Sequence, residues 1–322
     1  MKALVTGAGG FIGAHVVSAL AAAGAEVRAF DLDPPAEVSA GVEPLAGDLL
    51  DPAALAAAIE GCDAVFHLAA IYSFSRAEAA AMQRINVEGT RMLLEACARG
   101  GKRRRVVHTS SCSTCGPVPG RPATERDEPP AFELAVPYKR TKVEGERLAL
   151  RAAQDGLDVV VVNPTTPVGP GDRRPTPTGK MVADIAQGRA RAYLAGGYLN
   201  VVGVEDVARG HLLAHERGVS GQRYLLGGEN LSMREVFAAV ARAAGRRPPR
   251  LGVPWRLADG AARIAGATLG AVGREPKLLV HDEVRLARHP MTFDDAKARR
   301  ELGYGSRPAV EALAEAARAA LA

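Results

Sequence analysis

Aromatic residues and cysteine are scarce in this chain of 322 residues, which has 4% aromatic residues and four cysteines. So few cysteines in a chain of this length do not form a disulfide framework, which excludes the small disulfide-rich secreted classes. Long apolar runs are missing as well. None reaches the roughly 18 residues that a membrane-spanning helix needs, so we expect no membrane partner. The first residues enter a strand without a charged leader or a cleavable apolar region, and we therefore expect a cytoplasmic protein.

Segregated charge is also lacking, because the net charge of +5 is spread along the chain. The densest basic run, Lys102 to Arg105, lies between a predicted helix and a predicted strand, where a solvated loop is expected. We therefore expect no nucleic-acid partner. Cys112 and Cys115 have the spacing of a metal or redox pair, but no second Cys or His pair stands at ligand spacing. The sequence therefore predicts no metal site.

The first thirteen residues carry the strongest pattern in the chain. A short apolar strand, Ala3 to Val5, leads through Gly7, Gly10 and Gly13 into a helix that begins at Phe11. In such a turn the first glycine permits the bend, the second lets the backbone approach a pyrophosphate, and the third lets helix pack on strand. A glycine pattern by itself also fits an ordinary tight turn. Here its position between strand and helix predicts a dinucleotide site.

Asp31 ends the second predicted strand, Glu26 to Phe30. A carboxylate at this point accepts hydrogen bonds from the adenosine ribose and repels a 2′-phosphate. The alternative is an aspartate that simply starts the turn at Asp33-Pro34-Pro35. The ribose interpretation predicts NAD rather than NADP as the cofactor.

Strands and helices alternate through the first half of the chain, which predicts a parallel sheet covered by helices on both faces. We expect an α/β protein with a Rossmann-type doubly wound sheet and a smaller, mostly helical C-terminal substrate domain. Residues 1–165 would form the NAD-binding domain, completed by about 199–227, and residues 166–198 and 228–322 the substrate-binding region. One long helix is predicted from about Ala77 to Arg99, and helices with short connections from Pro254 to Ala322.

A loop rich in proline, glycine and threonine is predicted from Thr165 to Lys180. Its prolines restrict the backbone, so we expect a preshaped substrate lid at the carboxyl end of the sixth strand. Thr176 and Thr178 offer hydroxyl groups to a polyol substrate, and Arg173 and Arg174 offer charge to an anionic group. These arginines could equally face solvent.

Tyr138 and Lys142 are four residues apart in a predicted helix, so both side chains lie on one face. The lysine ammonium, with the positive charge of an oxidised nicotinamide, would lower the pKa of the tyrosine and make it a general base. Ser111, after the fifth strand, could hold the substrate oxygen. His67 and His108, inside strands, are expected in the core, and His211 and His215 lack a third ligand for a metal.

At this point the sequence resembles the extended short-chain dehydrogenases/reductases, over essentially the whole chain. The shared motifs stand in family order: Thr6-Gly7-x-x-Gly10-x-x-Gly13, Gly47-Asp48-Leu49, His67-Leu68-Ala69-Ala70, Asn86-Val87-x-Gly89-Thr90, Thr109-Ser110-Ser111, Tyr138-x-x-x-Lys142 and Asn163-Pro164. The stretch from Asn163 to Pro170, with Arg174 to Gly179, is similar to the hopanoid-associated sugar epimerases, a subgroup that borders the dihydroflavonol-reductase-like enzymes.

The resemblance implies a catalytic set of Ser111, Tyr138 and Lys142. It also implies that Asp48 and Leu49 hold the adenine and that Asn86 supports Lys142 through water. The full set of implied cofactor contacts is Gly7, Gly10, Phe11, Ile12, Gly13, Asp31, Asp48, Leu49, Leu68, Ala69, Ala70, Asn86, Thr109, Tyr138, Lys142 and Pro164. One departure counts against a UDP-sugar substrate, because Leu199-Asn200 stand where such epimerases carry an arginine for the diphosphate.

Three functions follow as alternatives. The first is an NAD-dependent sugar epimerase or related oxidoreductase, the second an NAD(P)-dependent carbonyl reductase, and the third a non-catalytic dinucleotide sensor. The substrate is expected to be a sugar or a ketone or alcohol. The resemblance also implies a homodimer whose seam would use Met92, Leu93 and Ala96 on one helix and Val143, Leu148 and Ala152 on another.

Overall fold

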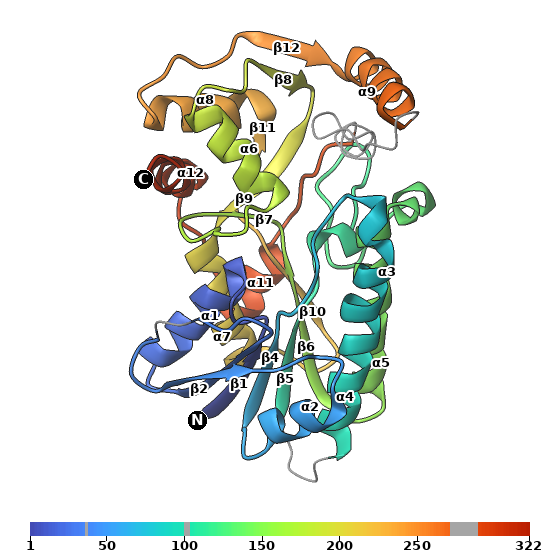
Figure 1. Ribbon diagram of the computed structural model, residues 1–322, viewed down its shortest axis with the longest axis vertical. Coiled ribbons are helices and arrows are strands. Elements are labelled where there is room, and N and C mark those ends of the chain that lie inside the picture. The colour runs from blue at the N-terminus through green and yellow to red at the C-terminus, as the bar shows by residue number, and fades with distance from the viewer. Residues whose placement is uncertain (36–37, 100–103, 271–288) are drawn as a thin grey trace.

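A seven-stranded parallel sheet forms the larger part of the computed structural model, which describes residues 1–35, 38–99, 104–270 and 289–322 (Figure 1). The strands lie in the order β3-β2-β1-β4-β5-β6-β10, so the direction of winding reverses between β1 and β4. Ligands of such sheets bind at this switch point, beyond the carboxyl ends of the strands. The strands are β1 (Lys2–Thr6), β2 (Glu26–Asp31), β3 (Val42–Ala46), β4 (Ala64–His67), β5 (Arg105–Thr109), β6 (Asp158–Pro164) and β10 (Arg223–Leu226). The predicted Rossmann-type sheet is confirmed.

Both faces of the sheet are covered, which explains why its strands are continuous apolar runs. In β6, Val160 and Val162 pack into one core cluster and Val159 and Val161 into another, and all four are fully buried. The first cluster lies under α1 (Phe11–Ala22) and α7 (Val204–Arg217), and the second under α2 (Pro52–Ile59), α4 (Thr90–Arg99) and α5 (Pro137–Gln154).

The long helix predicted from about Ala77 to Arg99 contains a π-helical segment that was not predicted. Between α3 (Ala79–Met82) and α4 the backbone is π-helical over Gln83–Gly89. Such a turn holds one residue more than an α-turn, and the apolar spacing of the sequence does not reveal it. The segment places Asn86 between the loop after β4 and α5, where its amide nitrogen donates to Ile71 O at 3.0 Å and to Thr141 Oγ1 at 3.1 Å.

A smaller part stands beyond the carboxyl ends of the main strands (Figure 1), and its regular structure is mostly helical, as the sequence predicted, although it also contains short strands. It holds a three-stranded sheet in the order β11-β9-β7 and a two-stranded sheet, β12-β8. The strands are β7 (Thr166–Val168), β8 (Ala192–Ala195), β9 (Tyr198–Gly203), β11 (Glu229–Ser232) and β12 (Leu251–Pro254). These strands are three to six residues long, and such short runs carry little periodicity.

The segment predicted as one loop from Thr165 to Lys180 contains regular structure at both ends. β7 pairs in parallel with β9, and Pro167 is tolerated there because β7 is an edge strand. The helix α6 (Pro177–Ala186) begins earlier than predicted, because the Thr176 hydroxyl accepts a hydrogen bond from Gly179 N. Residues 199–227 were predicted to complete the NAD-binding domain. Of these, α7 and β10 join the main sheet, whereas β9 belongs to the small sheet.

The helices α8 (Met233–Ala243) and α12 (Ala309–Ala319) pack with α6 over the three-stranded sheet. α9 (Trp255–Gly270) follows β12, and α11 (Ala296–Leu302) returns to the main sheet, where it contacts α7 and β10. The helices predicted between Pro254 and Ala322 are therefore present in part, and residues 271–288 lie outside the described residues. Within the described residues, no helix has the length and apolarity to cross a membrane.

Candidate active site

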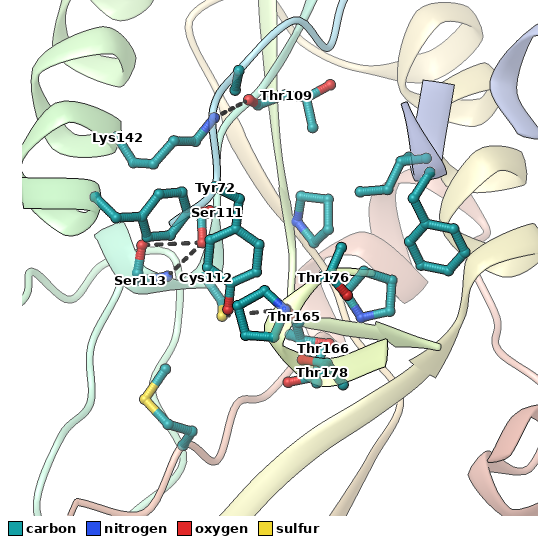
Figure 2. Close-up of a pocket in the computed structure, with 18 of the residues that line it drawn as sticks. Tyr72, Thr109, Ser111, Cys112, Ser113, Lys142, Thr165, Thr166, Thr176 and Thr178 are labelled. Atoms are coloured by element: carbon teal, nitrogen blue, oxygen red, sulfur yellow. Dashed lines mark hydrogen bonds between the residues drawn. The ribbon is translucent and has the colours of Figure 1, made fainter. Parts of the chain in front are cut away.

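A cavity of about 430 Å³ lies between the main sheet and the smaller part. Its floor is the glycine turn after β1 and the ends of β4, β5 and β6, and one side is the start of α5. The smaller part closes the other side with β9, α6 and α8. The chemistry-bearing side chains of both parts therefore face a common space (Figure 2).

The glycine turn has the geometry that a dinucleotide pyrophosphate needs. Gly7 has φ +73°, and a Cβ there would lie 2.6 Å from Ala69 N. A Cβ on Gly13 would lie 2.0 Å from Gly7 O, so any side chain would separate α1 from the turn. The turn brings the N-terminus of α1 to the edge of the cavity, where unpaired backbone N–H groups bind anions. These residues fit the diphosphate of a dinucleotide.

Asp31 is the last residue of β2 and lies beside the glycine turn. Its carboxylate accepts hydrogen bonds from Gly9 N at 3.0 Å and from Asp33 N at 3.2 Å. These bonds hold the carboxylate beside the turn and leave further lone pairs on its oxygens. The side chain is therefore placed to accept hydrogen bonds from a ribose.

Ser111, Tyr138 and Lys142 come together at the centre of the cavity, from two different elements. Lys142 Nζ donates a hydrogen bond to the main-chain carbonyl of Thr109 at 2.8 Å (Figure 2). Ser111 Oγ accepts from Ser113 N at 3.2 Å and from Ser113 Oγ at 3.0 Å. The predicted face of α5 therefore points into the site.

Burial dominates the electrostatics of this group. It raises the pKa of Tyr138, and the hydrogen bond with Ser111 offsets only part of that effect. It also lowers the pKa of Lys142 to about 8. The sequence predicted a lowered pKa for Tyr138 from two positive charges, of which the protein itself supplies only Lys142. The chain's own residues therefore favour a protonated phenol, which is the form that a general acid requires.

A buried polar network fixes the segment that carries Ser111. Asn163 Nδ2 donates to Ser111 O at 3.1 Å and to Glu146 Oε2 at 2.6 Å. Thr114 Oγ1 donates to the same carboxylate at 2.7 Å, and Arg223 pairs with it at 2.9 Å. Since Glu146 lies on α5, the network ties Ser111 to the helix of Tyr138 and Lys142.

The residues predicted for the cofactor and the substrate divide into two groups. Those that line the cavity are Gly7, Gly10, Phe11, Ile12, Gly13, Leu68, Ala70, Thr109, Ser111, Tyr138, Lys142, Pro164, Thr176 and Thr178. Those outside its lining are Asp31, Asp48, Leu49, Ala69, Asn86, Arg173 and Arg174. Asp48 Oδ1 accepts from Leu50 N at 2.9 Å, and Leu49 is buried against Gly89. Asn86 has both amide hydrogens engaged by Ile71 and Thr141, so its predicted support of Lys142 stays a prediction.

The two arginines predicted for the substrate point elsewhere. Arg174 forms an ion pair with Asp33 at 2.6 Å, and Arg173 lines a separate hollow between α6 and α12. The hydroxyl of Thr176 donates to Asp172 at 2.7 Å as well as capping α6. Thr178 also lines the cavity, and unlike Thr176 it neither bonds to Asp172 nor caps α6.

Several cavity residues were not predicted. Tyr72 and Phe74 follow Ala70, so the rule that strand ends converge could have found them. Others include Cys112, Ser113, Lys139, Met181, Tyr198, Leu199, Met233 and Met291, and those of the smaller part carry no sequence signal. Cys112 is buried, and burial raises the pKa of its thiol to about 12, which makes it a poor nucleophile.

The core histidines have structural partners. His67 lies between the hydroxyls of Thr6 at 2.8 Å and Thr90 at 3.0 Å, and its ring is 5.3 Å from that of His108. His211 bonds to Thr109 Oγ1 at 2.9 Å. In the described part of the chain, no three His, Cys, Asp or Glu side chains are grouped as metal ligands.

Comparison with known proteins adds relatives along the whole chain. Residues 3–227 match the model of the NAD dependent epimerase/dehydratase family. A putative dihydroflavonol 4-reductase of Synechocystis sp. is 38% identical, over 97% of this chain and 92% of the relative. Sterol demethylase protein B of Methylococcus capsulatus is 37% identical, over 94% of this chain and 93% of the relative. The solved structure of MoeE5 in complex with UDP-glucose and NAD has a TM-score of 0.76 and 28% identity, with all of both chains covered.

Proposed function

This chain belongs to the NAD-dependent epimerase/dehydratase family, and on that premise we propose that it is an NAD-dependent oxidoreductase of secondary alcohols or ketones. The observation that carries the proposal is the position of Ser111, Tyr138 and Lys142 in one cavity with the glycine turn. A bound nicotinamide would supply the hydride acceptor or donor at this place. All other parts of the chemistry come from the chain.

The roles of the three residues follow from their contacts. Tyr138 exchanges a proton with the substrate oxygen, and Ser111 holds that oxygen by a hydrogen bond. Lys142 places a positive charge beside the site and is fixed by its bond to Thr109 O. In the reducing direction the raised pKa of Tyr138 keeps it protonated, so that it donates its proton to the oxygen of the ketone.

NAD is proposed over NADP on the position of Asp31. Its carboxylate lies beside the glycine turn, where it would accept hydrogen bonds from the ribose hydroxyls and repel a 2′-phosphate. Arg174 is the nearby group that would favour a phosphate, and it is paired with Asp33. Because the ion pair offsets the guanidinium charge, Arg174 attracts a 2′-phosphate less strongly, which supports NAD over NADP.

We propose that the enzyme releases its oxidised or reduced product, as a dehydrogenase or reductase does. The relatives of Synechocystis and Methylococcus, named as a reductase and a sterol demethylase, support this outcome. The second candidate is a sugar epimerase, in which the ketone stays bound and is reduced from its other face. The similarity to MoeE5, solved with UDP-glucose, favours that candidate.

The test combines one variant with one measurement of turnover. Tyr138→Phe should lower kcat by about 10²- to 10⁴-fold, because the phenol hydroxyl exchanges the proton with the substrate oxygen. It should change the Kd of NAD by no more than about tenfold, because the hydroxyl is one of many implied cofactor contacts. Tyr193→Phe, a ring that packs on Phe237 outside the cavity, is the matched control. Unchanged kcat in Tyr138→Phe would overturn the catalytic assignment.

Turnover of the cofactor separates the two outcomes. A dehydrogenase forms NADH in proportion to the alcohol consumed, followed by absorbance. An epimerase converts its substrate with no net NADH and retains the cofactor during purification. Epimer formation without NADH would replace the proposed outcome by the second candidate.

A homodimer is proposed as well, with α4 and α5 at the seam. Met92, Ala96, Leu148 and Ala152 are partly buried, as a seam would require. Leu93 and Val143, also predicted for the seam, are buried within the subunit. The seam would therefore use fewer of the predicted residues.

A further inference from the structure

We propose that the substrate of this site is an apolar secondary alcohol or ketone, bound by two aromatic rings and three methionines, and not a nucleoside-diphosphate sugar. The inference rests on the proposed function and names its substrate class. It is carried by the shape and chemistry of the cavity wall around Tyr138.

The rings of Tyr72 and Phe74 lie against Tyr138, and we call these two rings the aromatic clamp. The ring centroids of Tyr72 and Tyr138 are 4.4 Å apart, and those of Phe74 and Tyr138 are 6.3 Å apart at an interplanar angle of 73°. Tyr72 is 40% exposed, although it lines the cavity. A large ring that keeps an exposed face at a cavity wall offers apolar area to a ligand.

Three methionines form the facing side, which we call the methionine wall: Met181 of α6, Met233 of α8 and Met291. Leu199 of β9 lies among them in the same lining. The backbone of Met291 is fixed by its bond from N to Tyr198 O at 3.1 Å. Methionine is unbranched and polarisable, so it adapts to an apolar ligand of irregular shape.

The wall offers little to a diphosphate. Lys139 and Lys142 are the only charged side chains among the described residues of the lining, and both are buried. Lys142 is bonded to Thr109 O, and Lys139 is paired with the buried carboxylate of Glu133. On β9, Asn200 is 1% exposed and bonds to Gly228 and Asn230, so it too faces away from a ligand.

These features act together. A diphosphate group needs cations or backbone donors when it leaves water, whereas an apolar skeleton needs only area and shape. Beyond the glycine turn, the described wall supplies apolar area from the aromatic clamp and the methionine wall, and hydroxyl groups such as those of Thr165, Thr166 and Thr178 add hydrogen-bonding groups without charge. The oxygen of the substrate is then the one polar group that requires partners, and Ser111 and Tyr138 provide them.

The test measures binding, so that it does not depend on turnover. The protein is loaded with NADH, with which an alcohol cannot react, and titrated by calorimetry with 2-butanol, 2-hexanol, 2-octanol and 2-decanol, and separately with UDP-glucose. Kd should fall by about fourfold for each added CH₂ until the cavity is full, which is the fold-change expected for burial of one methylene. UDP-glucose should bind more weakly than 2-octanol. A Kd that is independent of chain length, or UDP-glucose as the tighter ligand, would overturn the inference.

A matched pair of variants locates the effect at the methionine wall. Met233→Gln replaces a thioether by an amide of similar length and should raise the Kd of 2-octanol by roughly 2- to 30-fold. Leu257→Gln introduces the same amide at an exposed position of α9, outside the cavity lining, and should leave that Kd unaltered. Equal effects of the two variants would remove the wall from the binding site.

Turnover then distinguishes failure of this inference from failure of the proposed function. If the alcohols bind in the predicted order and no NADH forms from any alcohol tried, the proposed function fails and the apolar site stands. If UDP-glucose is oxidised with formation of NADH and the alcohols are neither bound nor oxidised, the oxidoreductase stands and the apolar site falls.

Discussion

Arg174 and Asp33 are 141 residues apart in the sequence, yet their side chains form an ion pair of 2.6 Å beside the carboxyl end of β2. Both side chains are mostly exposed, at 79% and 76%, so the pair contributes at most about 1 kcal/mol to stability. The ion pair is important because it determines where Arg174 lies. Arg174, which the sequence predicted for the substrate, is held near Asp31, the residue that we propose for the adenosine ribose.

The first prediction therefore concerns the cofactor. Asp31→Ala should raise the KM of NAD by roughly 10- to 100-fold, because hydrogen bonds to a carboxylate are lost, and should lower the KM of NADP, because Arg174 remains nearby. The double variant with Arg174→Ala should lose that gain for NADP. Asp155→Ala, at the exposed C-cap of α5, is the control. Steady-state kinetics with both cofactors check it, and equal effects on NAD and NADP would contradict it.

The second prediction concerns the buried pair of Lys139 and Glu133. Both side chains are almost fully inaccessible, at 4% and 0%. Glu133→Gln should cost about 3 to 5 kcal/mol of unfolding free energy, because a buried ammonium loses its partner. Glu133→Leu combined with Lys139→Met should recover most of this loss. Urea unfolding measures all variants. If the double variant loses as much stability as Glu133→Leu and Lys139→Met lose together when made singly, the two side chains are not coupled.

The third prediction is the loss of stability in acid. Burial lowers the pKa of His67 to about 3 from 6.5, so the unfolded chain binds a proton that the folded chain does not. This stability is fully present above pH 6.5 and is lost as the pH falls toward 3, by about 1.4 kcal/mol per pH unit. His67→Gln should lower the slope of unfolding free energy against pH, between pH 6 and 4, by that amount. Parallel slopes for the variant and the parent protein would refute it.

The fourth prediction concerns assembly. A groove between α4 and α5 is lined by Leu94, Leu148 and Ala152, with Arg91 and Arg151 at its sides. We expect a dimer by light scattering at micromolar concentration, and a monomer for Leu148→Arg, since the new charge would be buried at the seam. Val219→Arg, at an exposed site after α7, should leave the dimer intact. A parent protein that is already monomeric would exclude this seam.

The parts predicted correctly from the sequence depend on local patterns. The strand, glycine turn and helix from Lys2 to Ala22 follow from one short stretch, because each residue type has a backbone role there. The convergence of Tyr138 and Lys142 follows from helical periodicity. Gly7, Ser111 and Pro164 line one cavity because they lie at the carboxyl ends of three strands of one parallel sheet, β1, β5 and β6.

The parts that were missed depend on contacts between distant segments. β7 exists because Thr166 to Val168 pair with a strand more than 30 residues later, and a three-residue run containing proline gives no sign of this. Arg174 was assigned to the substrate because its loop leaves the nicotinamide side of the sheet, whereas the loop crosses to Asp33. Met233 and Met291 reach the cavity only through the packing of the smaller part.

The three strands of the small sheet come from separate parts of the chain, and this limits how the protein can be engineered. The strands are residues 166–168, 198–203 and 229–232, and between the last two the chain returns to the main sheet as α7 and β10. A chimera with a single exchange point inside this region would join strands of one parent to partners of another. Transplanting the specificity of a homologue therefore requires at least three matched segments to be exchanged together, and point changes at the cavity wall are the simpler route to a new substrate range.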